Sequence, residues 1–533
     1  MISTVDILII IIYLIAMLGI GYFVGKNNRT QEDFFLAGRS MPWIPIALSV
    51  SATMISANSF IGGPGWAYNE GIAPFMVNIT VPLAVFFALS VTTPVIYRVR
   101  VTSVYEYMEY RLGHISRNLT VAQFFINSLI QVSSMVFIPS LILQKLTGMP
   151  LKVVVPIVVI ISISYTIMGG IKAVIWTDVV QMIVLWGSLF AVIFLGLKHI
   201  NMGFFETIGM AREAGKLKAL DFQFDISKTN TFWASLIGGT IMWIRYFCFD
   251  QVQVQRVLTA KSLKGIKSSF LTSAFLMNIM YFIMLTVGLI LWVYFGGRKF
   301  QTSNEIMITY MLEKLPIGVL GLAISGALAA AMSSVDSLLN SLTTVFIKDI
   351  YEKYFKKDKG ETTLKLTMSI AAVFGVIIIL FVIVGFGGTV KSVLDVVGKY
   401  ISYFSGPACG SFLLAMFTLK ANDKGVAVGF ILGTIGCFLI ANVYKVSWLW
   451  NPAIGCALTC ILGYIASMLF KNSCKPINDI KEYTVNGMRE KMIKEGTIEE
   501  DGISILPFKI DKYAIITLVF FFLQYIFLAL LQF

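Results

Sequence analysis

The chain has 533 residues, of which 57% are hydrophobic and only 13% are charged, with a mean hydropathy of +0.81. A soluble globular chain carries about 25% charged residues, so this composition excludes that class. The chain has only two histidines, too few for histidine-based catalysis or a histidine metal cluster. No nucleophile–base pair is visible either, so we do not expect an enzyme.

Apolar segments of about 20 residues, long enough to cross a bilayer, recur along the whole chain. We predict about fourteen transmembrane helices by this criterion. They lie near residues 5–25, 43–66, 74–97, 120–143, 151–169, 174–197, 231–255, 270–296, 316–347, 366–387, 393–418, 425–443, 451–470 and 513–532. The sequence therefore predicts an all-α polytopic protein whose partner is the lipid bilayer.

The positive charges predict the orientation. About 28 of the 42 Lys and Arg residues fall in every second connection, including the polar segment 471–511, which we expect to be a surface helix or a loose linker. Basic connections face the cytoplasm. We therefore expect a cell-membrane protein with both termini outside. The net charge of +13 reflects this topology, and we expect neither nucleic-acid binding nor an obligate protein partner.

The second predicted span contains an unusual series of polar residues and glycines, SVSATMISANSFIGGPGWAY, from Ser49 to Tyr68. We expect this helix to be broken and to leave free backbone carbonyls around Ala52 to Ile55. The alternative is a kinked helix that packs through its small residues.

The seventh predicted span holds Gly238-Gly239 and two charges, Arg245 and Asp250. It occupies the position in a second half of the chain that the second span occupies in the first half. Interrupted helices in corresponding positions indicate a transporter binding site. Arg245 is a candidate ligand for an anionic substrate; alternatively, it neutralises Asp250 or another buried acid.

The ninth predicted span, GALAAAMSSVDSLLNSLTTVF, places its polar residues at three- and four-residue steps, so they share one helical face. Hydroxyls and one carboxylate, opposite a helix that offers carbonyls, suit a small hard cation. A polar seam between helices is the alternative. Asp178 in the sixth span is another buried acid that could join this cation pathway.

Several motifs along nearly the whole chain resemble those of the sodium:solute symporter family, particularly its sialic acid and iodide/monocarboxylate branches. These motifs are DFFLAGRSMP (33–42), TSVYEYMEYR (102–111), YTIMGGIKAVIWTD (165–178), DQVQVQR (250–256) and SSVDSLLNS (333–341). The resemblance implies a LeuT-type fold of two inverted five-helix repeats plus extra helices. It assigns residues 1–42 to an extra helix and cytoplasmic loop, 43–420 to the transport core, and 421–533 to additional helices.

The resemblance also implies that sodium is the coupling ion. Its main site is formed by the carbonyls of Ala52, Ile55 and Ala330 and the hydroxyls of Ser333 and Ser334. A second sodium site maps onto Ser333, Asp336, Ser337 and Asp178. Because Asp336 replaces a serine there, a proton or a structural ion pair is the alternative occupant.

The resemblance implies that the solute site contains Ser56, Ser59, Asn78, Gln131, Trp243 and Tyr246. The charge of Arg245 inside a span adds this residue as a seventh candidate. Gln131 replaces an arginine that grips a carboxylate in a sialic acid symporter, and Gly398 replaces a sugar-binding position. Because Arg245 and Lys399 offer positive charge, we expect import of a small organic anion, sialic acid or a monocarboxylate. A neutral sugar or polyol is the alternative solute, and a transport-like sensor or a channel is the alternative class.

Overall fold

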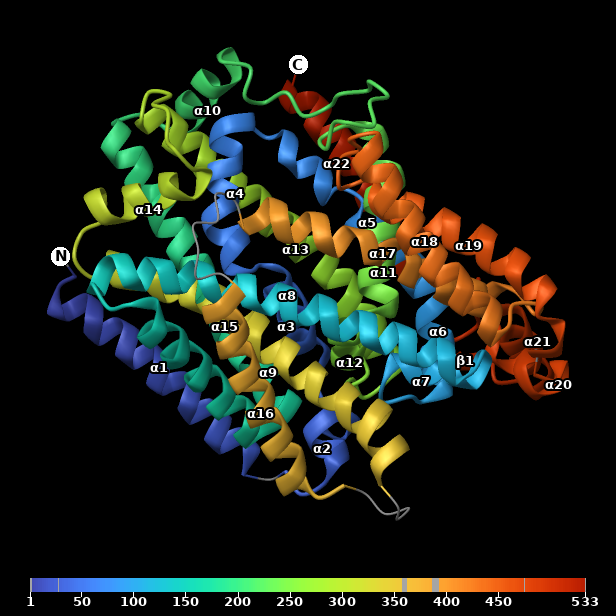
Figure 1. Cartoon of the computed structure of the whole chain (residues 1–533). Helices are drawn as coiled ribbons and strands as arrows, with labels where there is room; N and C mark the ends of the chain where they lie inside the picture. The colour runs from blue at the N-terminus through green and yellow to red at the C-terminus, as the bar shows by residue number, and fades with distance from the viewer. Residues whose placement is uncertain (1, 27, 357–361, 386–392, 474, 533) are drawn as a thin grey trace.

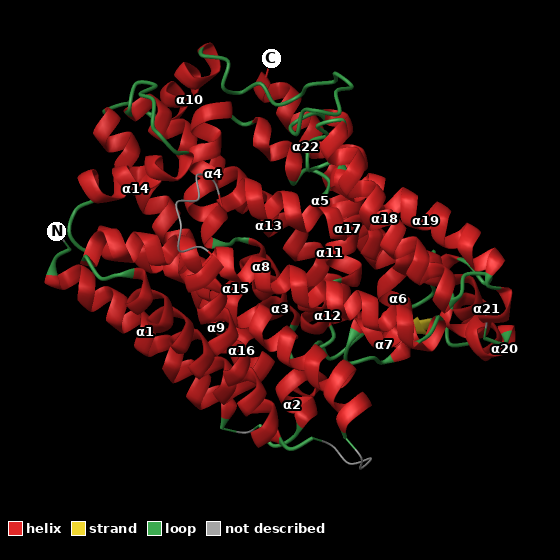
Figure 2. Cartoon of the chain, in the orientation of Figure 1, coloured by secondary structure: helices red, strands yellow, loops and turns green. Residues whose placement is uncertain are grey.

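The computed structural model describes residues 2–26, 28–356, 362–385, 393–473 and 475–532. The described chain is helical apart from one short hairpin of strands β1 (Glu499–Glu500) and β2 (Ile503–Ser504) (Figure 2). Helices far apart in sequence pack side by side, including α15 and α1 against α9. The prediction of an all-α protein is confirmed.

The helices follow one another in this order: α1 (Thr4–Gly25), α2 (Gln31–Leu36), α3 (Trp43–Met54), α4 (Ala57–Glu70), α5 (Val81–Phe87), α6 (Thr93–Val99), α7 (Val104–Arg111), α8 (His114–Thr147), α9 (Leu151–Ile200), α10 (Phe204–Glu213), α11 (Thr240–Phe249), α12 (Gln251–Val257), α13 (Leu263–Tyr294), α14 (Ser303–Lys314), α15 (Val319–Val345), α16 (Leu364–Gly385), α17 (Val393–Phe417), α18 (Asp423–Val443), α19 (Asn451–Leu469), α20 (Ile477–Ile480), α21 (Val485–Glu495) and α22 (Lys512–Gln532). Wider π-helical turns at Ala88–Thr92, Ala234–Gly239 and Phe346–Phe355 join or extend some of them.

Every predicted span falls on a helix or on a short series of helices. Within the described residues, ten helices are long and apolar enough to cross a membrane, and α3 with α4 forms an eleventh span bent by 60°. The count is lower than fourteen for three reasons. Helix α9 contains two predicted spans, separated at Gly170 (φ 56°, ψ −153°). The seventh span consists of a shorter apolar helix, Ala234–Phe249, followed by α12, so it is not one of the ten. The eleventh predicted span is α17, which is not one of the ten either.

The basic connections gather at one end of the bundle, which we call the basic end. The first turn of α8 meets the extension of α15 through an ion pair between Arg117 and Asp349 at 2.7 Å. Segment 471–511 is folded against this end, where Lys267 pairs with Asp511 at 2.5 Å. The segment is therefore an ordered cap containing α20, α21 and the hairpin. Figure 1 shows α2 at the lower edge and α10 with the C-terminus at the upper edge.

Helix α1 packs on α9 through glycines. A Cβ atom added at Gly21 would lie 2.4 Å from the Cβ of Tyr165, and one added at Gly25 would overlap the Met168 carbonyl. By contrast, a Cβ atom at Gly19 would meet no atom within 4 Å. The close approach of α1 therefore depends on two glycines on one face of the helix.

We expect Gly21→Leu to destabilise the purified protein, because the new side chain pushes α1 away from α9. Overpacking of this kind costs about 1–3 kcal/mol. The melting temperature in detergent should fall, whereas Gly19→Leu, two residues earlier in the same helix, should leave it unchanged or raise it. Equal melting temperatures for the two variants would contradict the described contact.

Candidate functional site

The second predicted span is broken, as its sequence indicates. Helix α3 ends at Met54, Ile55 adopts a non-helical conformation (φ −92°, ψ 85°), and α4 starts after Ser56. Ser56 caps the new helix by accepting the backbone N–H of Ser59 at 3.3 Å. The interruption therefore ends one helical hydrogen-bond ladder and starts another in the middle of the span, so the last carbonyls of α3 and the first amides of α4 do not bond to each other as in a continuous helix.

Helix α15 presents its hydroxyls to this break. The Ser334 hydroxyl donates to the carbonyl of Thr53 at 3.4 Å and to that of Ala330, one turn earlier, at 3.2 Å. Ala52, Ile55, Ala330, Ser333 and Ser334 are all at most 3% exposed. The structure therefore brings the two segments of the predicted main sodium site together in a buried position.

Asp178 on α9 orients the next hydroxyl of this group. Ser333 donates to one of its carboxylate oxygens at 2.5 Å, and Ser49 on α3 donates to the other at 2.5 Å. A hydroxyl whose proton is directed toward a carboxylate keeps its lone pairs for another partner. The lone pairs of the Ser333 oxygen therefore remain available to another partner, and Asp178 lies behind this hydroxyl as a positioning residue.

A fully buried arginine, Arg256 of α12, completes this cluster. Its Nε donates to Ser49 at 2.9 Å, and one terminal nitrogen lies 3.6 Å from Asp178 and donates to Ser337. Sequence reasoning missed this role because Arg256 ends the DQVQVQR motif at the border of a predicted span, where it counted as a cation of a cytoplasmic loop. The motif was a usable signal, because three glutamines alternate with valines directly before Arg256 at the end of an apolar span. All three glutamines are buried in the structure.

Two of the four residues assigned to a second sodium site, Asp178 and Ser337, are therefore in contact with a guanidinium. Asp336 instead turns toward α9, where it accepts the Tyr165 hydroxyl at 2.9 Å. Asp178 thus has a cationic partner within the protein, whereas the occupant opposite Asp336, a sodium ion, a proton or a structural pair, stays a prediction.

A cavity of about 440 Å³ lies beside the break. It extends along α4 from Ser56 to the exposed Asn69 and Glu70, at the end of the bundle opposite the basic end. Five of the predicted solute residues line it, namely Ser56, Ser59, Asn78, Gln131 and Trp243. The remaining wall is mainly aromatic and methionine-rich, with Trp66, Tyr281, Trp448, Met54, Met135, Met242, Met277 and Met284.

The other two predicted solute residues do not line the cavity. Arg245 forms an ion pair with Asp250 at 2.8 Å, and both side chains are buried. Arg245 lies two positions after Trp243, which rotates its side chain by about 200° around the helix, away from the cavity. Tyr246 accepts a hydrogen bond from Gln253 at 2.5 Å. Among the described residues, no Lys or Arg lines the cavity.

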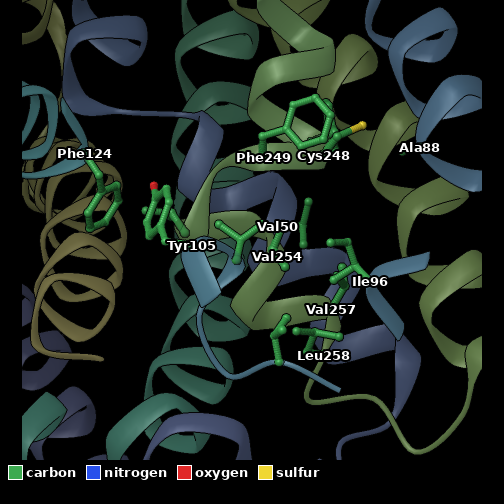
Figure 3. Close-up of a cluster of buried hydrophobic side chains, with 14 of the residues drawn as sticks. Val50, Ala88, Ile96, Tyr105, Phe124, Cys248, Phe249, Val254, Val257 and Leu258 are labelled. Atoms are coloured by element: carbon green, nitrogen blue, oxygen red, sulfur yellow. The ribbon is translucent and has the colours of Figure 1, made fainter. Parts of the chain in front are cut away.

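A buried apolar cluster lies around α12. Figure 3 shows Val254, Val257 and Leu258 there with Val50 of α3 and Ile96 of α6. All five are at most 4% exposed, so this part of the bundle is filled with apolar side chains, whereas the cavity reaches the exposed Asn69 and Glu70.

Comparison with known proteins identifies the group to which this architecture belongs. The profile of the sodium:solute symporter family matches residues 34–433. The chain belongs to the sodium:solute symporter family. It is therefore a multi-pass membrane transporter that couples solute movement to sodium, and not an enzyme.

Individual relatives are distant. The human sodium/iodide cotransporter is 27% identical, with 89% of this chain and 76% of the relative covered. The mouse sodium-coupled monocarboxylate transporter 2 is 28% identical, with 79% and 70% covered. The solved outward-open structure of a sodium-coupled sialic acid symporter is 26% identical, covers 88% of this chain and 98% of the other, and superposes with a TM-score of 0.78. The fold is accordingly LeuT-type.

We expect Arg256→Gln to destabilise the protein by about 3–5 kcal/mol, because it leaves the Asp178 carboxylate buried without its positive partner. Adding Asp178→Asn should restore part of this loss, since the double variant buries no charge at this position. Thermal unfolding of the two single variants and the double variant measures the coupling free energy. Strictly additive losses would show that the two side chains do not interact.

Proposed function

We propose that this symporter imports a small organic anion together with sodium bound between α3 and α15. The observation that supports the cation position is the contact of Ser334 with the broken end of α3, beside the cavity. In the proposed site, sodium receives the carbonyls of Ala52, Ile55 and Ala330 and the hydroxyls of Ser333 and Ser334. Such neutral oxygen donors suit a hard monovalent cation.

The proposed stoichiometry is one sodium at this position. A second sodium next to Asp178 and Ser337 would have to displace the Arg256 guanidinium, which lies 3.6 Å from Asp178. Arg256 already supplies the positive charge that a second cation would bring. Its charge stays with the protein during the cycle, whereas a bound ion leaves.

The proposed cycle uses alternating access. With the basic end in the cytoplasm and both termini outside, the described cavity faces the exterior. Sodium holds the two halves of the broken span in place and orders the first turn of α4, where the solute binds. Loss of sodium to the cytoplasm then releases the solute. Membrane voltage contributes about 2.3 kcal/mol per transported charge per 100 mV.

The proposed ligand of the solute's negative group is the amino end of α4, next to the amide of Gln131. Ser56, Asn58 and Ser59 at this end all line the cavity. A helix amino terminus carries unpaired N–H groups and a partial positive charge, and so it binds anions without an arginine. The names of two relatives, an iodide cotransporter and a monocarboxylate transporter, support an anionic solute for this chain.

A neutral sugar or polyol is the second candidate solute. The observation that favours it is the lining itself, in which Glu70 is charged and no described Lys or Arg is present. Several amide and hydroxyl groups of the lining could bind sugar hydroxyls, with the ring stacked on a tryptophan. The Arg245–Asp250 ion pair removes Arg245 from the argument for an anion.

For the sodium site, we expect Ser334→Ala to lower the apparent sodium affinity by about tenfold, which equals about 1.4 kcal/mol. The measurement is sodium-dependent uptake into proteoliposomes at saturating solute. Ser325→Ala is the matched control, because Ser325 is equally buried on α15 but bonds only to its own helix, at Gly321. Unchanged sodium affinity in Ser334→Ala would place the ion elsewhere.

For the solute, the melting temperature of the purified protein should rise with small carboxylates such as pyruvate in sodium buffer and not in potassium buffer. A ligand at 100 times its Kd adds about 2.7 kcal/mol of stability. Gln131→Leu should weaken this effect, whereas Gln123→Leu, on the same helix outside the cavity lining, should not. Sodium-dependent stabilisation by neutral sugars alone would instead establish the second candidate.

A further inference from the structure

A second, wholly apolar groove of about 460 Å³ lies on the outer surface between α1 and the second half of α9. Gly19, Ile20 and Phe23 of α1 form one wall, and Trp176 and Val180 of α9 form the other. Phe23 is 74% exposed and Trp176 38% exposed, so both face the surroundings of the bundle. At Gly19 the groove exists because a side chain is missing, since a Cβ atom there would meet nothing within 4 Å.

The position of the groove along the membrane follows from the α1–α9 contact. The side chain of Asn28, just beyond α1, donates to the Gly169 carbonyl at 2.9 Å, which places the end of α1 at the break in α9. At 1.5 Å per residue, the groove residues lie within about 15 Å of this break. Half of a bilayer core of about 30 Å is also about 15 Å. The groove therefore spans the leaflet on the basic side.

Three cations surround the basic end of this groove. Lys26 and Arg29 follow α1 directly and are exposed, and Lys172 lies one turn before Trp176 on α9. In the part of the chain that the structure describes, none of the three has a carboxylate within 4 Å. The carboxylate of nearby Asp33 instead accepts the backbone N–H groups of Arg29 and Thr30 at 3.1 and 3.0 Å.

We propose that this groove binds an anionic phospholipid of the basic-side leaflet. One acyl chain lies between α1 and α9, and the headgroup phosphate contacts Lys26, Arg29 and Lys172. Asp33, whose carboxylate interacts electrostatically with Lys172, offsets only one of the three positive charges. An apolar slot of leaflet length that ends at a group with net positive charge matches such a lipid in both shape and charge. The proposal is independent of the solute and of the sodium site, because no residue that lines the groove lines the cavity or belongs to the proposed sodium site.

The test compares lipids with identical dioleoyl chains. The full-length protein is delipidated in detergent, and its melting temperature is measured with added phosphatidylglycerol or phosphatidylcholine. We expect a larger rise with phosphatidylglycerol, and we expect Lys26→Gln/Lys172→Gln to lose at least half of that difference. The control Lys145→Gln/Lys198→Gln, which changes two exposed lysines of other connections, should retain it.

Gly19→Leu tests the acyl-chain part separately, because a Cβ atom there meets no protein atom within 4 Å and the leucine side chain extends into the groove. Native mass spectrometry should show one fewer retained phosphatidylglycerol than in Gly187→Leu, which also places leucine at an open, exposed glycine, outside the groove. An equal effect of the two lipids on the unmodified protein overturns the proposal. Retention of the lipid in the double lysine variant or in Gly19→Leu overturns it as well.

Discussion

The buried contact between Arg256 and Asp178 organises the centre of this transporter. It joins four helices, because Arg256 belongs to α12, Asp178 to α9, and their hydroxyl partners Ser49 and Ser337 to α3 and α15. A buried charge is tolerated only when it is paired and hydrogen-bonded. This requirement fixes the rotation of each helix about its axis. Once α15 is fixed by this contact, Ser333 and Ser334 necessarily face the end of α3.

The break in the second span then gives this arrangement its chemistry. A continuous helix would satisfy its own carbonyls and amides, whereas the interruption at Ile55 exposes carbonyls on one side and amides on the other. The carbonyls face α15 and suit a cation, and the amides face the cavity and suit a negative group. One local interruption therefore places the two proposed ligands next to each other, which is a direct physical basis for coupling their binding.

Much of the fold could be predicted because its signals are local. Apolar length identified the spans, alternating charge identified the basic end, and the polar residues and glycines of SVSATMISANSFIGGPGWAY indicated a broken helix. The break itself lies at Ile55, whereas Gly62 to Gly65 lie inside α4. The solute site was less predictable. In sequence, Arg245 lies inside the seventh predicted span and Arg256 directly follows it, yet Arg245 pairs with the nearby Asp250 and Arg256 reaches across to α9. Nothing in a linear pattern states which acid an arginine meets.

Hydropathy by itself determined that this is a polytopic membrane protein, since it depends on neighbours along one helix, and the resemblance of the motifs implied a sodium-coupled symporter of LeuT type. Only the tertiary structure decided how charge is distributed around the two binding regions. It removed Arg245 from the cavity, placed Arg256 among the residues assigned to a second cation, and folded segment 471–511 into an ordered cap. The physical reason is that each of these outcomes depends on contacts between helices distant in sequence, whose relative rotation is set by packing and by the pairing of buried charges.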